Sequence, residues 1–567
     1  MMTNPDKGKA LQSVLLRPRN QQKTAEHYYA GLVVAYDSGK NLAFDGESTT
    51  VPMALTVHSR RMAQRIYCVA EHVYCAVGYA LANVIIVVGA DGLIVIDCTE
   101  SLEAGQLVMA DFAIAAPEAA KLPVVAVIYT HNHTDHIGGV RAFTNPQAIA
   151  SGQCQVIAHS TLMKTVQHNA SVVAPILGAR SAYSFGALLQ TGPAGVVNGG
   201  IGPVLAKGKT TFIAPSLTFD DALDITLSGV RFELRHAPSE TDDEIIAWLP
   251  DSRVLLSAEV VQGECLANVH TLRGTRYRDP QQWVRTLDMM RKEHHLRDVQ
   301  AMVPAHGRPV LGAANVLELL TSYRDAIAFI HDQAVRLMNQ GVKPDELADL
   351  LPALPPHLSD HAWLGEYYGT VKHSVRQVFA GELGWFDGDP ATLDPLPPKD
   401  RAARWLALMG GVQSALAQVA QNVTAEPRWA AELATVIIRG ERSDEAAIAA
   451  AKRYKADAFQ ALAYKTENIN WRNWYLTAAN ELRGAYDALV LGQNGGGLAS
   501  PDILASLEPA HLLGLLSVRV AAERCLDLQA SIQFCIQKDS ALHVVLLELR
   551  CGVMQCSEAQ QPYPAIP

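Results

Sequence analysis

Four potential metal ligands lie within six residues, directly after an apolar run of the sequence. The run Val124–Tyr129 predicts a buried β-strand, and it leads into His131, His133, Asp135 and His136. Side chains on an extended segment alternate sides, so the first two histidines can face one metal ion together. The other two ligands lie where the chain turns and can serve a second ion. Neutral imidazole and carboxylate groups suit zinc.

Three further candidate ligands occur downstream, each close to a run that reads as a strand. Glu240 lies between two such runs, Glu259 ends the apolar run that contains Leu255, and His306 follows the short run at Met302. A carboxylate or histidine alone would be unremarkable in any of these places. Their order after the histidine cluster predicts that they complete a metal site at one edge of a sheet.

The chain from Ile66 to about Leu311 alternates short β-rich runs with turns and helical stretches. The runs include Ile66–Ala76, and Leu102–Ala115 reads as a helix. This mixture predicts an α/β sandwich. The Gly/Pro-rich stretch Thr191–Pro215 predicts a long loop over a site, since structureless loops of that length are usually functional.

Later parts of the chain have a different character. Amphipathic helical patterns dominate from Ala313 to Leu491, and a glycine-rich linker follows at Gly492–Gly497. A helix near Asp502–Leu516 and strand-like runs at Ala530–Ile536 and Ala541–Leu549 predict a small α+β segment. We therefore predict an N-terminal arm (1–60), an α/β domain (61–312), a helical domain (313–491) and a C-terminal segment (498–567).

Composition narrows the class of function. The net charge of −10 argues against nucleic acid as a partner, because no basic surface is indicated. The N-terminal residues lack an apolar signal core, and no apolar run is long enough to insert stably in a membrane. The nine cysteines include no CxxC pair, so we expect reduced thiols in a cytoplasmic protein.

The His-x-His-x-Asp-His pattern is similar to the signature of the metallo-β-lactamase superfamily, which implies an αββα sandwich. Glutamates at 240 and 259 resemble the linear (type III) alkylsulfatases, in place of the more common His and Asp. Other stretches are similar to the same family over roughly residues 60 to 560. They are Gly78–Asn83, Asp91–Asp97, Thr271–Gly274 with Arg278–Asp279, Leu383–Pro390 and Glu467–Tyr475.

The resemblance implies a role for each candidate residue and two zinc ions per protomer. His131, His133 and Glu240 would hold one ion, Asp135, His136 and His306 would hold the other, and Glu259 would bridge them. Asn268 and Arg273 would bind the sulfate group of an alkyl sulfate substrate, because guanidinium donors suit an oxyanion. His373 would act near the leaving group, and Tyr183 with Arg180 would contribute further sulfate contacts or packing.

The resemblance also implies a homodimer formed by the helical domain and an apolar channel for the alkyl chain. A water activated by the two metals would attack the ester, at sulfur or at carbon. The loop around Glu240 is more acidic than in the family, and the C-terminal segment resembles only the first half of a sterol-carrier-like domain. Two alternatives remain open: another hydrolase of this fold (a lactonase, thioesterase or phosphodiesterase), and a non-catalytic lipid-binding protein.

Overall fold

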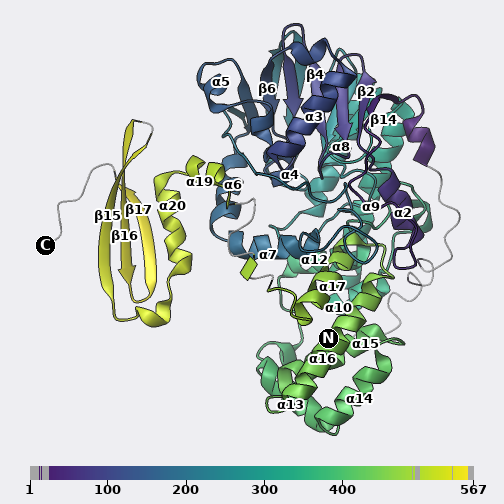
Figure 1. Ribbon diagram of the computed structural model, residues 1–567, viewed down its shortest axis with the longest axis vertical. Coiled ribbons are helices and arrows are strands. Elements are labelled where there is room, and N and C mark those ends of the chain that lie inside the picture. Colours follow the sequence, from purple (N-terminus) through teal and green to yellow (C-terminus); the bar gives the residue numbers. More distant parts are fainter. Residues whose placement is uncertain are drawn as a thin grey trace.

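The computed structural model describes residues 12, 15, 25–487, 490–491, 499–538 and 540–559. Two β-sheets pack face to face, and helices cover the outer face of each sheet (Figure 1). A helical region extends from one end of this sandwich, and a small three-stranded sheet stands to one side. The predicted linker Gly492–Gly497 and the chain end at 560–567 lie outside the described residues.

The first sheet has eight strands that neighbour one another in chain order. They are β1 (Val33–Asp37), β2 (Arg65–Ala70), β3 (Val73–Val77), β4 (Val84–Val88), β5 (Leu93–Ile96), β6 (Val124–Ile128), β7 (Gln155–His159) and β8 (Leu217–Phe219). Pairing is antiparallel from β1 to β5 and parallel from β5 to β8. β4 and β5 contain only Val, Ile and Leu, because both faces of this sheet are covered.

The run Ile66–Ala76, predicted as a single β-rich run, is a hairpin of two strands, β2 and β3. Glu71 and His72 form the turn, and His72 adopts a left-handed backbone with φ 66°. The apolar pattern continues on both sides of this turn, so hydrophobicity alone does not separate the strands. β1 also pairs with β2, so part of the segment predicted as an N-terminal arm extends the sheet.

The second sheet has six strands in the order β14-β13-β12-β11-β10-β9. They are β9 (Ala222–Leu227), β10 (Val230–His236), β11 (Ile245–Leu249), β12 (Val254–Ala258), β13 (Ala301–Pro304) and β14 (Val310–Leu311). Only β12 and β13 pair in parallel. A helix of 18 residues, α8 (Pro280–Arg297), connects these two strands, as parallel neighbours require a crossover.

Three apolar layers hold the sandwich together. Between the sheets, residues such as Ile94 on β5 pack with residues such as Val303 on β13. On the outer face of the first sheet lies α3 (Leu102–Ala115), which buries Phe112. On the outer face of the second sheet lie α8, with Trp283, and α9 (Ala313–Met338). This order of helix, sheet, sheet and helix is the predicted αββα sandwich.

The helical region continues from α9. Its helices are α10 (Pro344–Leu350), α11 (Pro356–Ser359), α12 (Val371–Leu383), α13 (Pro398–Leu408), α14 (Val412–Asn422), α15 (Pro427–Gly440), α16 (Glu445–Ala463) and α17 (Ile469–Leu482). Residues of α10 and α12 share the core of the second sheet, whereas α13 to α16 enclose an apolar core of their own. The predicted limits of this domain remain predictions.

α17 ties the helical region to the sandwich through Arg472, whose side chain is fully buried. Its guanidinium donates to the backbone carbonyls of Pro193 and Gly195 in the long loop, and to those of Thr50 and Ala463. These bonds satisfy the buried donors and fix the loop in place. Helical residues far along the sequence thus position a segment of the α/β domain.

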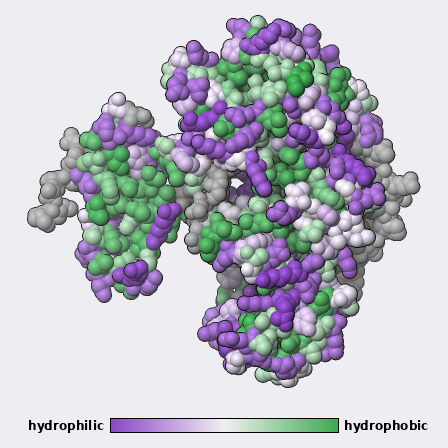
Figure 2. All heavy atoms as spheres, viewed as in Figure 1, coloured by the Kyte–Doolittle hydropathy of each residue, from purple (hydrophilic) through white to green (hydrophobic). Residues whose placement is uncertain are grey.

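The C-terminal segment begins with two short helices, α19 (Pro501–Ser506) and α20 (Pro509–Gly514). We predicted one helix near Asp502–Leu516, but Pro509 cannot continue a preceding helix and begins a new one. The three-stranded sheet consists of β15 (Gln529–Lys538), β16 (Ala541–Arg550) and β17 (Val553–Ala559). Figure 2 shows apolar side chains gathered on the visible face of this module.

Two further observations concern compartment and membrane. All nine cysteines are described, and each is a free thiol. Among the described residues, we find no helix with the length and apolar character that crossing a bilayer requires.

Candidate metal centre

The seven predicted ligands gather at one edge of the two sheets. They are His131, His133, Asp135, His136, Glu240, Glu259 and His306. The first four follow β6 directly, and the short helix α4 (Thr134–Ile137) carries two of them. The other three come from the second sheet: from the loop between β10 and β11, from the end of β12 and from the end of β13. The site therefore lies where both sheets meet.

The segment that carries the first four ligands is pressed against the loop after β5. A Cβ atom on Gly138 would lie 2.6 Å from the carbonyl oxygen of Thr134 and 2.7 Å from that of Glu100. A Cβ atom on Gly139 would lie closer still, 2.1 Å from the carbonyl oxygen of Cys98. Glycine is required at both positions because a side chain would push the ligand segment away from this loop.

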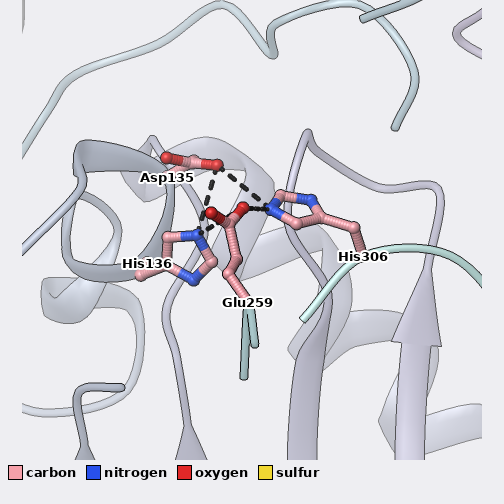
Figure 3. A group of neighbouring side chains, drawn as sticks. All are labelled: Asp135, His136, Glu259 and His306. Atoms are coloured by element: carbon pink, nitrogen blue, oxygen red, sulfur yellow. Dashed lines mark hydrogen bonds and ion pairs between the residues drawn. The ribbon is translucent and has the colours of Figure 1, made fainter. Parts of the chain in front are cut away.

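Asp135, His136, Glu259 and His306 converge on one point (Figure 3). The Nε2 atom of His136 lies 3.3 Å from Oδ2 of Asp135 and 3.7 Å from Oε1 of Glu259. Nε2 of His306 lies 3.7 Å from the same oxygen of Asp135 and directly contacts Glu259. The ligand atoms of the four residues all lie within 4.8 Å of one another.

A second group consists of His131, His133 and Glu259. Nε2 of His131 lies 2.8 Å from Nδ1 of His133 and 3.9 Å from Oε2 of Glu259. Glu259 thus belongs to both groups, as the proposed bridging role requires. Glu240 lies at the side of this group, with its Oε1 3.4 Å from Nδ1 of His133.

Neighbouring groups orient the histidine rings for metal binding. Nδ1–H of His136 donates to Asp97 at 2.8 Å, and Nδ1–H of His306 donates to the carbonyl of Leu81 at 2.8 Å. Each bond leaves Nε2 as the ring nitrogen that faces the cluster. Nε2 of His136 is buried and has no hydrogen-bond partner among the described residues. Burial lowers the pKa of His131 well below its usual range, which favours the neutral ligand form.

These observations fit a pair of metal ions. Buried nitrogen and carboxylate oxygen atoms face one another across two small groups, and an unpartnered ring nitrogen points inward. Cations would satisfy all of these atoms together, whereas buried carboxylates without a cation are costly. The donor set suits zinc, since it combines imidazole nitrogen with carboxylate oxygen.

Glu244 connects the two glutamate ligands. Its Oε1 accepts the backbone N–H of Glu259 at 2.6 Å, and its Oε2 accepts the backbone N–H of Glu240 at 3.2 Å and the hydroxyl of Ser239. The residue before Glu259, Ala258, has φ 50°, a left-handed conformation that bends the chain at the end of β12. One buried carboxylate thus positions two ligand-bearing loops.

The side chain of Glu240 is fixed by two more residues. Arg278 forms a buried ion pair with it and also donates to the carbonyl of Asn268 at 2.7 Å. The Gln262 amide contacts the other oxygen of Glu240 and accepts the backbone N–H of Asn268 at 2.7 Å. Burial raises the pKa of Glu240, although Arg278 opposes this effect.

A cavity of about 370 Å³ opens onto the metal groups. Its polar end includes His133, Asp135, Glu259 and Arg273. Its remaining wall is mainly apolar and comes from α4, the long loop, α6 (Leu162–Ser171), α7 (Ala174–Ser184) and the C-terminal segment. The larger apolar lining residues include Leu81, Ile137, Val166, Leu177, Phe185, Leu188, Ile201, Leu205, Leu491 and Ile503. The long loop covers the site, as its length predicts.

Arg273 is the cation at the polar end. Its Nη2 donates to Nε2 of His133 at 3.0 Å. Arg180 on α7 donates to the carbonyls of Arg273 and Leu272 at 2.8 and 2.6 Å, so it supports the backbone of this loop. The Tyr183 hydroxyl bonds Glu481 on α17, and the ring stacks near Trp474. Neither Arg180 nor Tyr183 lines the cavity in the described part of the chain.

Asn268 and His373 are buried next to each other and are not among the lining residues of the cavity in the described part of the chain. Trp471 donates its indole N–H to Nδ1 of His373 at 3.1 Å, so the ring proton resides on Nε2, which donates to Oδ1 of Asn268 at 3.1 Å. Burial lowers the pKa of His373 to about 3, so the ring is neutral. The Asn268 amide nitrogen is buried without a hydrogen-bond partner among the described residues.

Several residues that shape the site were not assigned from the sequence. Asp97 and Arg278 stand in stretches that we compared with the family, yet their contacts with His136 and Glu240 depend on pairing between distant segments. Glu244 and Gln262 carry no local signal of their own. Trp471 lies in the compared stretch Glu467–Tyr475, but the resemblance does not reveal its hydrogen bond to His373.

Comparisons with known proteins support this description. Residues 78–306 match the metallo-β-lactamase superfamily, and residues 343–485 match the alkyl sulfatase dimerisation family. A linear primary-alkylsulfatase of Pseudomonas sp. (strain ATCC 19151) is 44% identical over 479 residues, which are 83% of this chain and 88% of that protein. An alkyl/aryl-sulfatase of Saccharomyces cerevisiae is 34% identical over 421 residues, which are 74% of this chain and 64% of that protein.

One solved structure aligns with almost the whole chain. The stereoselective inverting sec-alkylsulfatase Pisa1 from Pseudomonas sp. superposes with a TM-score of 0.81 at 27% identity. The alignment covers 98% of this chain and 86% of that one. Sandwich, helical region and C-terminal module are therefore arranged alike in the two proteins.

Proposed function

The chain belongs to the alkylsulfatase family of the metallo-β-lactamase superfamily, and on that basis we propose that it hydrolyses alkyl sulfate esters to an alcohol and inorganic sulfate. The observation that carries this proposal is the two-ended cavity. Cationic Arg273 and the metal groups form one end, and an apolar wall forms the rest. An anionic head on a hydrocarbon tail matches both ends at once.

We propose two zinc ions as the resident metals. His131, His133 and Glu240 are the proposed ligands of one ion, Asp135, His136 and His306 those of the other, and Glu259 the bridge. Glu240 contacts Arg278 as well, so its carboxylate must be shared between a cation and this guanidinium. Two bound zinc ions would supply a water of lowered pKa as the nucleophile and a positive site for the sulfate oxygens.

The hydrogen-bond pattern around His133 explains how Arg273 becomes available to substrate. Nδ1 of His133 faces Nε2 of His131 at 2.8 Å, and Nε2 of His133 lies 3.0 Å from Nη2 of Arg273. A neutral histidine that binds metal through Nδ1 carries its hydrogen on Nε2 and cannot accept there. The guanidinium then has donors to offer to a sulfate group in the cavity, with a planar fork that suits an oxyanion.

Asn268 is the second proposed sulfate donor. Because its Oδ1 accepts from His373, the unpartnered amide nitrogen is the atom left to bind an anion. His373 is proposed to act near the leaving group, and the geometry favours an indirect role in which it holds the Asn268 amide in one orientation. Trp471 fixes the tautomer of His373 that this role requires.

The proposed assembly is a homodimer formed through the helical region. Between residues 383 and 429 several large apolar side chains are exposed, namely Leu383, Trp385, Leu393, Leu396, Trp405, Leu408 and Trp429. Exposed apolar patches of this kind mark protein interfaces. All of these residues lie within the stretch that matches the dimerisation family.

Sulfate release by the zinc-loaded protein tests the function. Octyl and dodecyl sulfate should release sulfate faster than butyl sulfate, since each buried methylene contributes about 0.8 kcal/mol. A compact aryl sulfate, a lactone, a thioester and a phosphodiester serve as comparison substrates for the other activities of this fold. If zinc-loaded protein hydrolysed one of these but no alkyl sulfate, the proposed substrate class would be wrong.

A further inference from the structure

α19 supplies part of the cavity wall although it lies more than 300 residues beyond the metal ligands of the first sheet. Ile503 on this helix lines the cavity, and its side chain is only 3% exposed. It packs in the same apolar layer as Ile137, which follows the ligand His136, and Val166 on α6. In Figure 1, α19 lies beside α6, between the sandwich and the C-terminal sheet.

Polar contacts anchor α19 to two segments of the α/β domain. Asp502 accepts two hydrogen bonds from Arg141, Nε to Oδ2 at 2.8 Å and Nη2 to Oδ1 at 3.0 Å. Oδ2 of Asp502 also accepts the backbone N–H of Phe212 at 3.1 Å. Arg141 follows the metal-ligand segment by five residues, and Phe212 belongs to the long loop that covers the site. A bidentate ion pair fixes the relative orientation of the two side chains as well as their distance.

The start of the helix is fixed locally. Ser500 accepts the backbone N–H of Ile503 through its hydroxyl oxygen at 3.4 Å, and Pro501 occupies the first turn. Ile503 therefore has a defined direction relative to Asp502. The next residue, Leu504, is partly exposed and does not line the cavity in the described part of the chain.

We infer that α19 is a selectivity element for the alkyl chain, in which Ile503 closes the apolar part of the cavity and the Arg141–Asp502 pair holds it there. The inference rests on the proposed function, since it concerns the tail of the same substrate. According to this inference, a C-terminal helix limits the length of the alkyl chain that fits the cavity. An ion pair outside the metal centre keeps this helix in position.

Chain-length profiles of two opposite substitutions test the role of Ile503. Ile503→Trp adds bulk to the wall and should lower the ratio of dodecyl to butyl sulfate kcat/KM by about tenfold, as displacement of two methylenes implies. Ile503→Ala removes bulk and should move the plateau toward longer chains. Leu504→Trp is the matched control on the same helix and should keep the wild-type ratio. If kcat/KM of both Ile503 variants depended on chain length in the same way as that of the wild type, the inference would be overturned.

The anchoring pair is tested by charge reversal. Asp502→Arg should lower the ratio of dodecyl to butyl sulfate kcat/KM by raising KM for the longer chain. Adding Arg141→Asp should restore this ratio in part, because the ion pair returns but the bond from the Phe212 N–H does not. Zinc content should be unchanged in all variants, which separates this effect from damage to the metal centre. If wild-type protein released no sulfate, the proposed function would fail instead. Active wild-type protein with an unaltered ratio in Asp502→Arg would refute the anchoring role.

Discussion

Replacing Glu244 with Gln should weaken metal binding even though Glu244 is not a proposed ligand. The carboxylate accepts the backbone N–H groups of Glu259 and Glu240 and the hydroxyl of Ser239, one set at each oxygen. A glutamine side chain has one oxygen and one NH2 group, so at one of these places a donor meets a donor. The substitution keeps the size of the side chain and changes its hydrogen-bonding pattern and its charge.

The expected magnitude follows from the buried donors. A buried hydrogen-bonding group that loses its partner costs about 1–3 kcal/mol. In the metal-free protein the loops that carry Glu240 and Glu259 can relax and recover part of this cost. Metal binding must then return these loops to their original positions. The free energy that relaxation recovered is lost again at that step, so it weakens the binding of the metal. The loss of unfolding free energy in the metal-free protein and the loss of binding free energy should together amount to about 1–3 kcal/mol.

Two measurements on the same variant check this sum. Competition with a chromophoric chelator gives the zinc Kd, which should rise by up to about a hundredfold, in the range for residues that support metal ligands. Urea unfolding of the metal-free protein gives the loss of unfolding free energy, which is the other contribution to the sum. Asp242→Asn is a matched control, because it removes one negative charge from the same loop at an exposed side chain. Unchanged Kd together with unchanged stability in Glu244→Gln would refute the reasoning.

Four other outcomes are expected. Elemental analysis should find about two zinc ions per protomer, and chelation should abolish sulfate release; full activity in metal-free protein would contradict the metal centre. Arg273→Ala should keep its zinc but lose about 2–4 kcal/mol of transition-state stabilisation, judged from kcat/KM, with poor rescue by Arg273→Lys. Trp471→Phe removes the donor to His373 and should lower kcat severalfold with zinc content intact. An unchanged kcat would show that His373 does not depend on this hydrogen bond. Light scattering should give a dimer mass that Leu408→Glu reduces to that of a monomer; a monomeric wild type would exclude the dimer.

The candidate metal ligands could be proposed from the sequence because their signal is local or ordered along the chain. His131, His133, Asp135 and His136 fall within six residues after a strand, and the strand β6 could be predicted from its apolar run. Glu240, Glu259 and His306 could be proposed because each stands near a strand end. The αββα sandwich followed from the same alternation of elements and from the family resemblance.

What the sequence does not specify are contacts between segments that tertiary folding brings together. Arg141 and Asp502 are separated by 361 positions, and neither residue carries a local pattern. Tyr183 shows the converse problem, since a motif placed it near the site but its hydroxyl bonds Glu481 on another helix. Short turns within apolar runs, such as that at His72, are also invisible to a hydrophobic pattern.

The position of Glu259 has a consequence for the life of the protein in a cell. The two candidate metal groups that share Glu259 combine residues of the first sheet with residues at the ends of two strands of the second, so bound ions would act as cross-links between the two halves of the sandwich. By mass action, free metal at a hundredfold excess over Kd adds about 2.7 kcal/mol to the stability of the folded state. A newly made chain that lacks metal would open between its sheets more often and present strands to proteases. Metal supply would then set the abundance of the enzyme as well as its activity.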